Sequence, residues 1–323
     1  MSAALPRWLS NRPPAAAVEI NPRRVTAAVI AQSGGTRVLT SYAGEPLAPG
    51  VVDAALNGPN IHDPAALTTA IRSVLDRLSS RPKRIALVLP DTVGKLSLIR
   101  FEKIPAKVQD LDQLIRWQVR KAAPFRIEDA QVSWVPGIVP PEGGREYIVT
   151  VARRDIIESY ERACEAAGAY PGIVDLATVN LINAVLGVEG RVPPATDWLL
   201  VHVAADYSTM AVVRGANVIF FRTRPSEEGD DLADLVHQTA MYHEDRLGGG
   251  SGGFGRVVLA GASLRGADVA ERLRRELESR LGTRVEALDF RGAVALRDRI
   301  AAAPELLDSL APAIGGILRE RVA

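Results

Sequence analysis

Cysteine is almost absent from this chain, since Cys164 is the only one among its 323 residues. A single thiol can build neither a disulfide framework nor a cysteine-based metal site, which excludes disulfide-rich and zinc-ribbon classes and agrees with a reducing cytoplasm. Net charge is almost absent too, because 39 basic residues stand against 38 acidic ones. We therefore expect no nucleic-acid partner.

Long apolar runs are also missing. No stretch reaches the roughly 18 apolar residues that cross a bilayer, and the amino terminus lacks the apolar core of a secretory signal. A hydrophobic content of 47% with 24% charged residues is typical of a globular protein, and the length suits about two domains. Residues 1–17 are expected to be a flexible lead, although Trp8 and Leu9, beside Arg7 and Arg12, could also touch a membrane surface.

Strand signals dominate the first part of the chain. Alternating apolar residues predict strands at 18–20, 25–31 and 37–42, followed by an amphipathic helix over 64–78. A buried strand is predicted at 84–90. This order suits a mixed sheet with covering helices.

The pattern then changes. Residues 93–170 show a strand–helix–strand–strand–helix order, which predicts a compact α+β unit inserted into the larger sheet domain. We assign 18–92 and 171–190 to the first domain. After a Gly- and Pro-rich joint, the second domain covers 197–323, with a helix over 227–247.

Two hairpins resemble each other. VEINPRRVTAAVI (18–30) opens the first domain, and VHVAADYSTMAVV (201–213) opens the second. Each has the pattern of a strand, a tight turn and another strand. Such an internal duplication is expected when two related domains face each other across a cleft.

Several long stretches carry a resemblance to a known family. They are LAPGVVDAALNGPNIHDPAALTTAIRSVL, LPDTVGKLSLIRFEKIPAKVQDLDQLIRWQVRKAAPFRIEDAQVSWVPG, VTVARRDIIESYERACEAAGAYPGIVDLATVNLINAV and RVVLAGASLRGADVAERLRRELESRLGTRVEALD. In this order they resemble the type IV pilus assembly protein PilM family, which has an actin-like ATPase fold and is related to the cytoplasmic domain of the type II secretion protein GspL. The resemblance implies an α/β, actin-like (RNase H-like) two-domain fold with an inserted α+β subdomain.

The resemblance also implies a function. Members of this family lie in the cytoplasm, peripheral to the inner membrane, and bind the N-terminal tail of the membrane protein PilN in a groove that involves the inserted subdomain. They belong to the platform that assembles the pilus. For the tail we expect contacts from Leu96, Ile99, Trp117 and Phe125 in the inserted unit, since aromatic and aliphatic side chains are common anchors of bound peptides. Trp117 and Phe125 could instead pack against neighbouring strands.

In this fold ATP and Mg²⁺ lie between the two hairpins, where glycines and acids hold the phosphates. The first hairpin of this chain has Glu19, Asn21 and Arg23 at those positions. Asn21 could adopt the left-handed conformation that glycine would supply, and Arg23 could contact phosphate, but Pro22 removes a backbone donor.

The second hairpin departs further, since His202 and Ala204 replace an acid and a glycine, and Asp206 lies two residues beyond. On the adenosine side, Gly261 is kept between two alanines. The family's cleft-wall subdomain is reduced around residues 225–255, where SEEGDD replaces it. We expect no catalytic residues and no cofactor, and nucleotide binding to be lost.

No other group of residues predicts a catalytic, metal or phosphate site. His237 and His243 lie six apart, the wrong spacing for a helical metal pair, so they are expected to be surface or cap residues. The GGGSGGFG run (248–255) precedes a strand and is expected to be a linker. No metal site is predicted.

Three functional hypotheses remain. The first is a scaffold that captures a PilN-like tail. The second is an ATP-binding switch or weak ATPase of the same machinery, and the third is a polymerising filament protein, because actin-like folds assemble head to tail.

Overall fold

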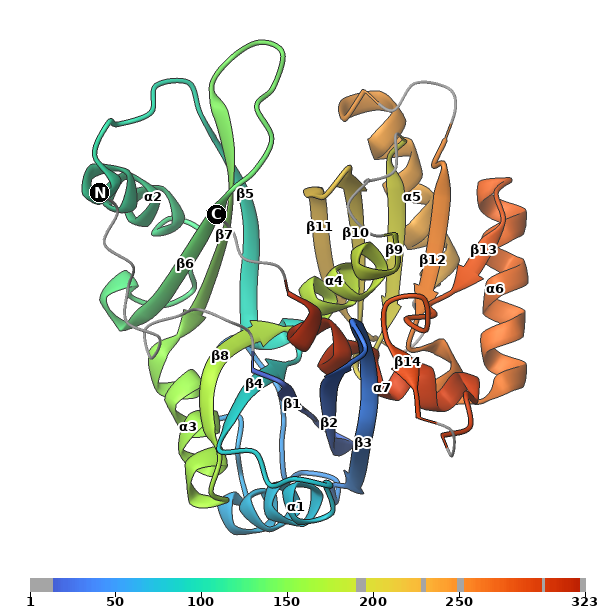
Figure 1. Ribbon diagram of the computed structural model, residues 1–323. Helices are drawn as coiled ribbons and strands as arrows, with labels where there is room; N and C mark the ends of the chain where they lie inside the picture. The colour runs from blue at the N-terminus through green and yellow to red at the C-terminus, as the bar shows by residue number, and fades with distance from the viewer. Residues whose placement is uncertain (1–13, 190–195, 228–230, 249–252, 298–299, 320–323) are drawn as a thin grey trace.

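The computed structural model describes residues 14–189, 196–227, 231–248, 253–297 and 300–319. Parts of the predicted 187–197 joint and of the GGGSGGFG run lie outside these ranges, as does most of the amino-terminal lead. Within the described residues the chain builds two large sheets and a smaller third sheet (Figure 1).

The first sheet has the strand order β14-β3-β2-β1-β4-β8. Its strands are β1 (Ala16–Asn21), β2 (Arg24–Ser33), β3 (Thr36–Pro46), β4 (Arg84–Leu89), β8 (Tyr170–Leu176) and β14 (Ala295–Leu296). β1 therefore begins two residues inside the segment predicted as a lead. Strands β1, β2 and β3 are antiparallel, whereas β1, β4 and β8 run parallel.

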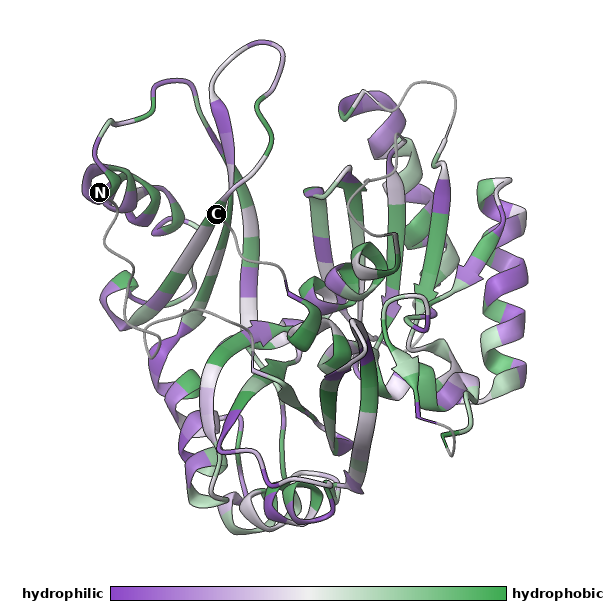
Figure 2. Cartoon of the chain, in the orientation of Figure 1, coloured by the Kyte–Doolittle hydropathy of each residue, from purple (hydrophilic) through white to green (hydrophobic). Residues whose placement is uncertain are grey.

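Both faces of this sheet are covered because its strands alternate between two cores. Val18 and Ile20 face the core shared with helices α1 (Pro64–Asp76) and α3 (Arg154–Ala166), while Ala17 faces the core shared with α4 (Ala177–Glu189) and α7 (Pro304–Leu318). Hydrophobic residues accordingly gather on the central strands in Figure 2, and hydrophilic residues on the outward faces of the helices.

The second sheet repeats the order as β11-β10-β9-β12-β13. Its strands are β9 (Trp198–Val203), β10 (Tyr207–Arg214), β11 (Asn217–Pro225), β12 (Arg256–Ala260) and β13 (Val285–Ala287). In each sheet the hairpin supplies the first two strands, and the fourth strand pairs with the first. Helices α5 (Leu232–Arg246) and α6 (Ala267–Leu281) pack against this sheet's own core.

The third sheet, β5-β7-β6, is the inserted unit. It consists of β5 (Gly94–Phe101), β6 (Ala130–Pro136) and β7 (Arg145–Arg153), with α2 (Val108–Val119) on one face. Helix α3, predicted to belong to this unit, instead packs on the first sheet, because its apolar side carries Ile156, Tyr160 and Cys164 into that core.

The carboxyl-terminal segment also returns to the first sheet, although 197–323 was predicted to be the second domain. β14 pairs with β3, and α7 packs against α4, β1, β2 and β4. The two helices cross so closely that a Cβ at Gly315 would lie 1.7 Å from the carbonyl oxygen of Asn180. Glycine is therefore required where α7 crosses α4.

Helix α5 begins at Leu232, later than the predicted Glu227, because the Asp231 side chain accepts hydrogen bonds from the first free backbone N–H groups. Only residues 226–231 separate it from β11, the short connection that the sequence predicts. None of the helices in the described ranges is long and apolar enough to span a membrane.

Candidate functional site

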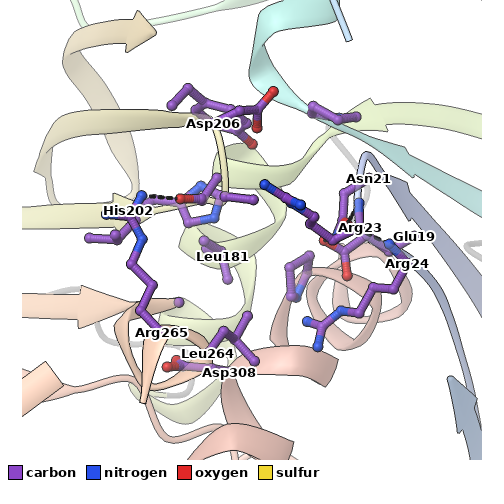
Figure 3. Close-up of a pocket in the computed structure, with 17 residues that line it drawn as sticks. Glu19, Asn21, Arg23, Arg24, Leu181, His202, Asp206, Leu264, Arg265 and Asp308 are labelled. Atoms are coloured by element: carbon purple, nitrogen blue, oxygen red, sulfur yellow. Dashed lines mark hydrogen bonds between the residues drawn. The ribbon is translucent and has the colours of Figure 1, made fainter. Parts of the chain in front are cut away.

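A cavity of about 390 Å³ lies between the two hairpins (Figure 3). All six residues predicted from the resemblance line it: Glu19, Asn21, Arg23, Ala204, Asp206 and Gly261. Its polar lining also includes Arg24, His202, Tyr207, Arg265 and Asp308. The duplicated topology brings these segments together, because each hairpin turn lies at the same end of its sheet. The predicted loss of nucleotide binding is not tested by this geometry and stays a prediction.

The first hairpin turn satisfies its own backbone donors. The Asn21 side-chain oxygen accepts hydrogen bonds from the N–H groups of Arg23 and Arg24, each at 3.0 Å. Pro22 has no N–H to offer. Asn21 does not use the left-handed conformation that it could have adopted, since every described residue with positive φ is a glycine. Its short side chain caps the turn instead, so the amides that would cradle a phosphate are already occupied.

Glu19 is buried beside this turn. Its Oε1 accepts a hydrogen bond from the Asn21 amide at 3.3 Å, whereas Oε2 has no partner among the described residues. Burial raises the pKa of the Glu19 carboxyl, although Arg24 acts in the opposite direction. Because a metal ligand must be deprotonated, a raised pKa of the Glu19 carboxyl works against Mg²⁺ binding there.

The second hairpin turn is closed in a similar way. Ala204 N–H donates to the Tyr207 carbonyl at 3.0 Å, and the Arg265 guanidinium donates to the Ala204 carbonyl at 2.6 Å. Gly261 has φ +82° and packs so tightly that a Cβ there would lie 2.4 Å from the Val203 carbonyl oxygen. The β12 turn thus rests directly on the second hairpin.

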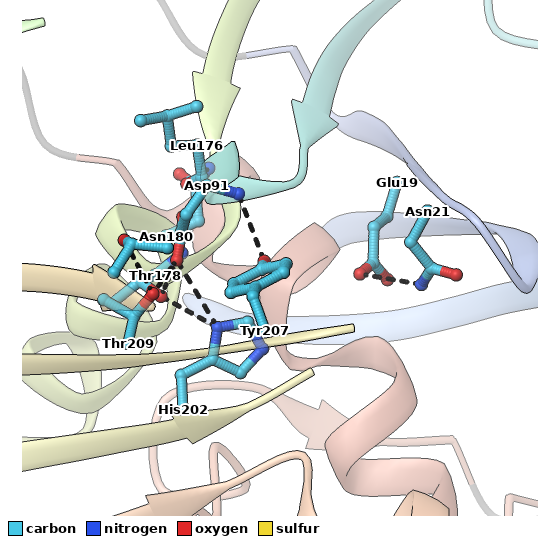
Figure 4. Close-up of polar contacts among 10 residues, drawn as sticks. Glu19, Asn21, Asp91, Leu176, Thr178, Asn180, His202, Tyr207 and Thr209 are labelled. Atoms are coloured by element: carbon cyan, nitrogen blue, oxygen red, sulfur yellow. Dashed lines mark hydrogen bonds and ion pairs between the residues drawn. The ribbon is translucent and has the colours of Figure 1, made fainter. Parts of the chain in front are cut away.

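A buried polar cluster connects the two halves behind the cavity (Figure 4). The Asp91 carboxylate accepts hydrogen bonds from Thr178 N–H at 3.0 Å, from the Thr209 hydroxyl at 2.7 Å and from the Thr178 hydroxyl. The Thr178 hydroxyl also lies 2.8 Å from His202 Nδ1, and the Asp91 N–H donates to the Tyr207 hydroxyl at 3.1 Å. Sequence reasoning missed this cluster, although the Pro-Asp turn that contains Asp91 lies in one of the stretches carrying the resemblance.

Contacts in this cluster come from both halves of the chain. Asp91 and Thr178 belong to the first half, and His202, Tyr207 and Thr209 to the second. All five side chains are buried. Protein side chains therefore bridge the two halves behind the cavity.

The four residues predicted to bind a partner tail do not form one surface. Leu96 lines a second hollow of about 660 Å³ between β5 and β11. Ile99 and Phe125 pack, partly buried, on the core under α2. Trp117 is 58% exposed on the outer side of α2, so it does not pack against the strands.

The hollow beside Leu96 has an apolar wall and a polar rim. Phe221, Leu56 and Ala54 line it, together with the charged side chains of Asp53 and Arg222. β5 and β11 are each the last strand of their sheets over the described residues, so each keeps one edge of backbone donors and acceptors without a strand partner. Such edges can accept an added strand.

His243 differs from the expectation of a surface or cap residue, because it is buried. Its Nε2 lies 2.8 Å from Asp197 Oδ2, and its ring stacks on Phe254 at 4.5 Å. Burial opposes ionisation of Asp197, but hydrogen bonds from Arg214 and His243 outweigh it and hold the pKa of this carboxyl below its usual range. His243 therefore stabilises the start of the second half; His237 is exposed.

Two sheets of equal strand order, each opened by a hairpin that borders a shared cleft, define the actin-like ATPase fold. Within this class the chain belongs to the type IV pilus assembly protein PilM family, whose model matches residues 17–244. Both predictions from the resemblance, the fold and the family, are confirmed.

Solved structures agree on the fold. The PilM–PilN type IV pilus biogenesis complex has a TM-score of 0.77 at 19% identity, covering 95% of this chain and 98% of that one. Ethanolamine utilization protein EutJ from Carboxydothermus hydrogenoformans has a TM-score of 0.50 at 11% identity, covering 96% of this chain and 90% of that one. The cytoplasmic domain of EpsL from Vibrio cholerae is more distant, with a TM-score of 0.47 at 8% identity, covering 89% of this chain and 87% of that one. A comparison with curated proteins found no match.

Proposed function

We propose that this chain is an adaptor of a type IV pilus assembly platform that captures the N-terminal tail of a PilN-like membrane protein, and that its cleft has lost nucleotide binding. The hollow between the free edges of β5 and β11 carries the first part of the proposal. The protein would lie in the cytoplasm beneath the inner membrane, held there by the captured tail and without chemical turnover.

Strand addition suits this hollow. A tail in extended conformation would pair with the free backbone edge of β5 and place alternate apolar side chains against Leu96 and Phe221. Asp53 and the nearby Asp206 would receive basic residues of the tail. The PilM–PilN complex among the similar structures supports this kind of partner.

Two observations support the loss of nucleotide. The Asn21 side chain already accepts from the amides of the first turn, and the Ala204 N–H of the second turn already donates to the Tyr207 carbonyl. A triphosphate would have to displace these contacts, and its Mg²⁺ would have to bind Glu19, whose raised pKa disfavours the charge that Mg²⁺ needs.

A nucleotide-dependent switch is the second candidate. Arg23, Arg24 and Arg265 all line the cavity and could together bind a polyphosphate. In that case nucleotide would close the cleft and change the affinity for the tail.

The adaptor proposal is tested by isothermal titration of the full chain with a synthetic PilN-like tail peptide. We expect micromolar binding, and at least an about tenfold loss in Leu96→Asp because a charge would enter the apolar wall. Val269→Asp, on the exposed side of α6, is the matched control and should bind normally. Absence of binding at high micromolar peptide, or equal binding by both variants, would contradict the proposal.

Backbone pairing has its own test. Peptides N-methylated at alternate residues lose the donors on one edge of an added strand but keep every side chain. One of the two alternating sets should abolish binding and the other should not. If both sets bind as well as the parent peptide, the tail does not add as a strand.

A further inference from the structure

An exposed tryptophan marks the outer side of the inserted unit. Helix α2 turns Leu111, Ile115 and Val119 toward the third sheet, and Trp117 lies on the opposite side. Its side chain is 58% exposed, whereas tryptophan is usually well buried. The indole N–H has no hydrogen-bond partner among the described residues.

The orientation of α2 is fixed, so Trp117 cannot turn inward. The Asp112 carboxylate accepts hydrogen bonds from Trp134 Nε1 at 3.0 Å and from Arg116 Nε at 2.7 Å. Trp134 belongs to β6 and packs edge-on against Tyr147 in the core. Rotation of the helix would break these contacts and the apolar packing together.

Basic residues follow Trp117 closely in the sequence, and one of them contacts its ring. Lys121 Nζ lies 5.2 Å from the centre of the Trp117 ring. Arg120 is exposed about one helical turn after Trp117, and the Arg126 side chain is 79% exposed. Arg126 has one ion pair, with Glu128 at 3.7 Å. Residues 100–126 contain seven basic and three acidic residues in a chain whose net charge is +1.

A shallow hollow adjoins this helix. It measures about 570 Å³, and the residues that line it include Arg120, Phe125 and Arg126, with the acidic Glu128 beside Arg126. Two guanidinium groups beside an apolar ring match a ligand with a phosphate and an attached apolar chain.

We propose that Trp117, Arg120, Lys121 and Arg126, here called the Trp117 surface, bind an anionic phospholipid bilayer. An indole placed among lysine and arginine side chains is the arrangement that lies at the boundary between headgroups and acyl chains. A protein partner of ordinary affinity would need about 1,000 Å² of complementary surface, whereas this surface is the outer side of one helix with a shallow hollow beside it.

The Trp117 surface can act together with the hollow between β5 and β11, here called the tail groove. Ile99 faces the core under α2, and Leu96, an odd number of positions away on the same strand, faces the other side of the third sheet. Lipid and tail would therefore contact opposite faces of the inserted unit. Contact with lipid does not depend on the tail being bound.

The test is co-sedimentation of the full chain with vesicles of phosphatidylglycerol and phosphatidylethanolamine, compared with vesicles of phosphatidylcholine alone. We expect sedimentation only with the anionic vesicles, weakening as salt rises. The double variant Arg120→Gln/Lys121→Gln should bind about 25-fold more weakly, at about fivefold for each cation. Trp117→Ser should also lose binding.

Matched controls use exposed residues elsewhere. Tyr170→Ser removes an aromatic side chain that is 61% exposed, and Arg162→Gln/Arg275→Gln removes two exposed cations. These variants should sediment as the parent chain does. Equal sedimentation with both kinds of vesicle, no sedimentation with either, or an equal loss in test and control variants would overturn the proposal. Peptide titration of Trp117→Ser without vesicles should remain normal, which separates this surface from the tail groove.

Discussion

Substitution of Asp91 by alanine should weaken the connection between the two halves of the protein. The side chain accepts three hydrogen bonds, two from Thr178 and one from Thr209, at a fully buried position. A hydrogen bond to a charged group contributes about 1.5–3 kcal/mol, and the contributions within one cluster do not add fully. Removal of one member of a buried charged network typically costs about 3–5 kcal/mol.

We therefore expect Asp91→Ala to lower the free energy of unfolding by about 3–5 kcal/mol. At about 2 °C for each kcal/mol, Tm should fall by about 6–10 °C. Urea unfolding followed by circular dichroism measures the loss. Hydrogen exchange at the Thr178 amide should accelerate as well, because its acceptor is gone.

Asp91→Asn is the matched control, because it keeps the acceptor for Thr178 N–H and changes only the oxygen that faces the two hydroxyls. It should cost less than the alanine variant. A loss below about 1 kcal/mol in Asp91→Ala, with unchanged exchange at Thr178, would show that the cluster does not hold the halves together.

Three further predictions follow from single residues. Gly261→Ala should destabilise the protein by about 2–4 kcal/mol in urea, because alanine disfavours φ +82° and its Cβ would meet the Val203 carbonyl; an unchanged midpoint would contradict that close approach. Glu19→Gln should raise Tm at pH 7 but not at pH 4. A carboxyl with a raised pKa does not lower the free energy of unfolding at pH values below its ordinary pKa of 4.5, but lowers it as the pH rises above that value. An equal change in Tm at both pH values would refute the burial of this carboxyl. Burial raises the pKa of Cys164 to about 12, so a thiol reagent should label it only after urea unfolds the chain, and rapid labelling of the folded protein would count against a buried thiol.

The sequence predicts the local parts of the cleft well. Strand alternation in both hairpins, together with the family resemblance, was enough to predict that Glu19, Asn21, Ala204 and Gly261 line one cavity. Each of these residues lies at a turn whose place in the sheet follows from the repeated topology. The sequence also contained a pattern for the side chain that caps the first hairpin turn, that of Asn21. Asparagine before proline is typical of a side chain that accepts from the following backbone amides.

Long-range polar contacts could not be predicted in this way. Asp91 lies 87 positions from Thr178 and 118 from Thr209, and no periodicity indicates such pairs. His243 is buried because Asp197 and Phe254 meet it in space, although its helix has a polar sequence. The return of α7 to the first sheet was missed because position in the chain alone suggested the second domain.

The central claim is that this PilM-family chain captures a PilN-like tail without using a nucleotide. The most direct measurement is the titration of the full chain with the tail peptide in the presence and absence of Mg-ATP, alongside a titration with Mg-ATP alone. We predict micromolar peptide binding that is the same in both conditions, and no saturable heat from Mg-ATP. Peptide binding that requires Mg-ATP, or saturable nucleotide binding that changes the peptide affinity, would contradict this account and support the nucleotide-dependent switch.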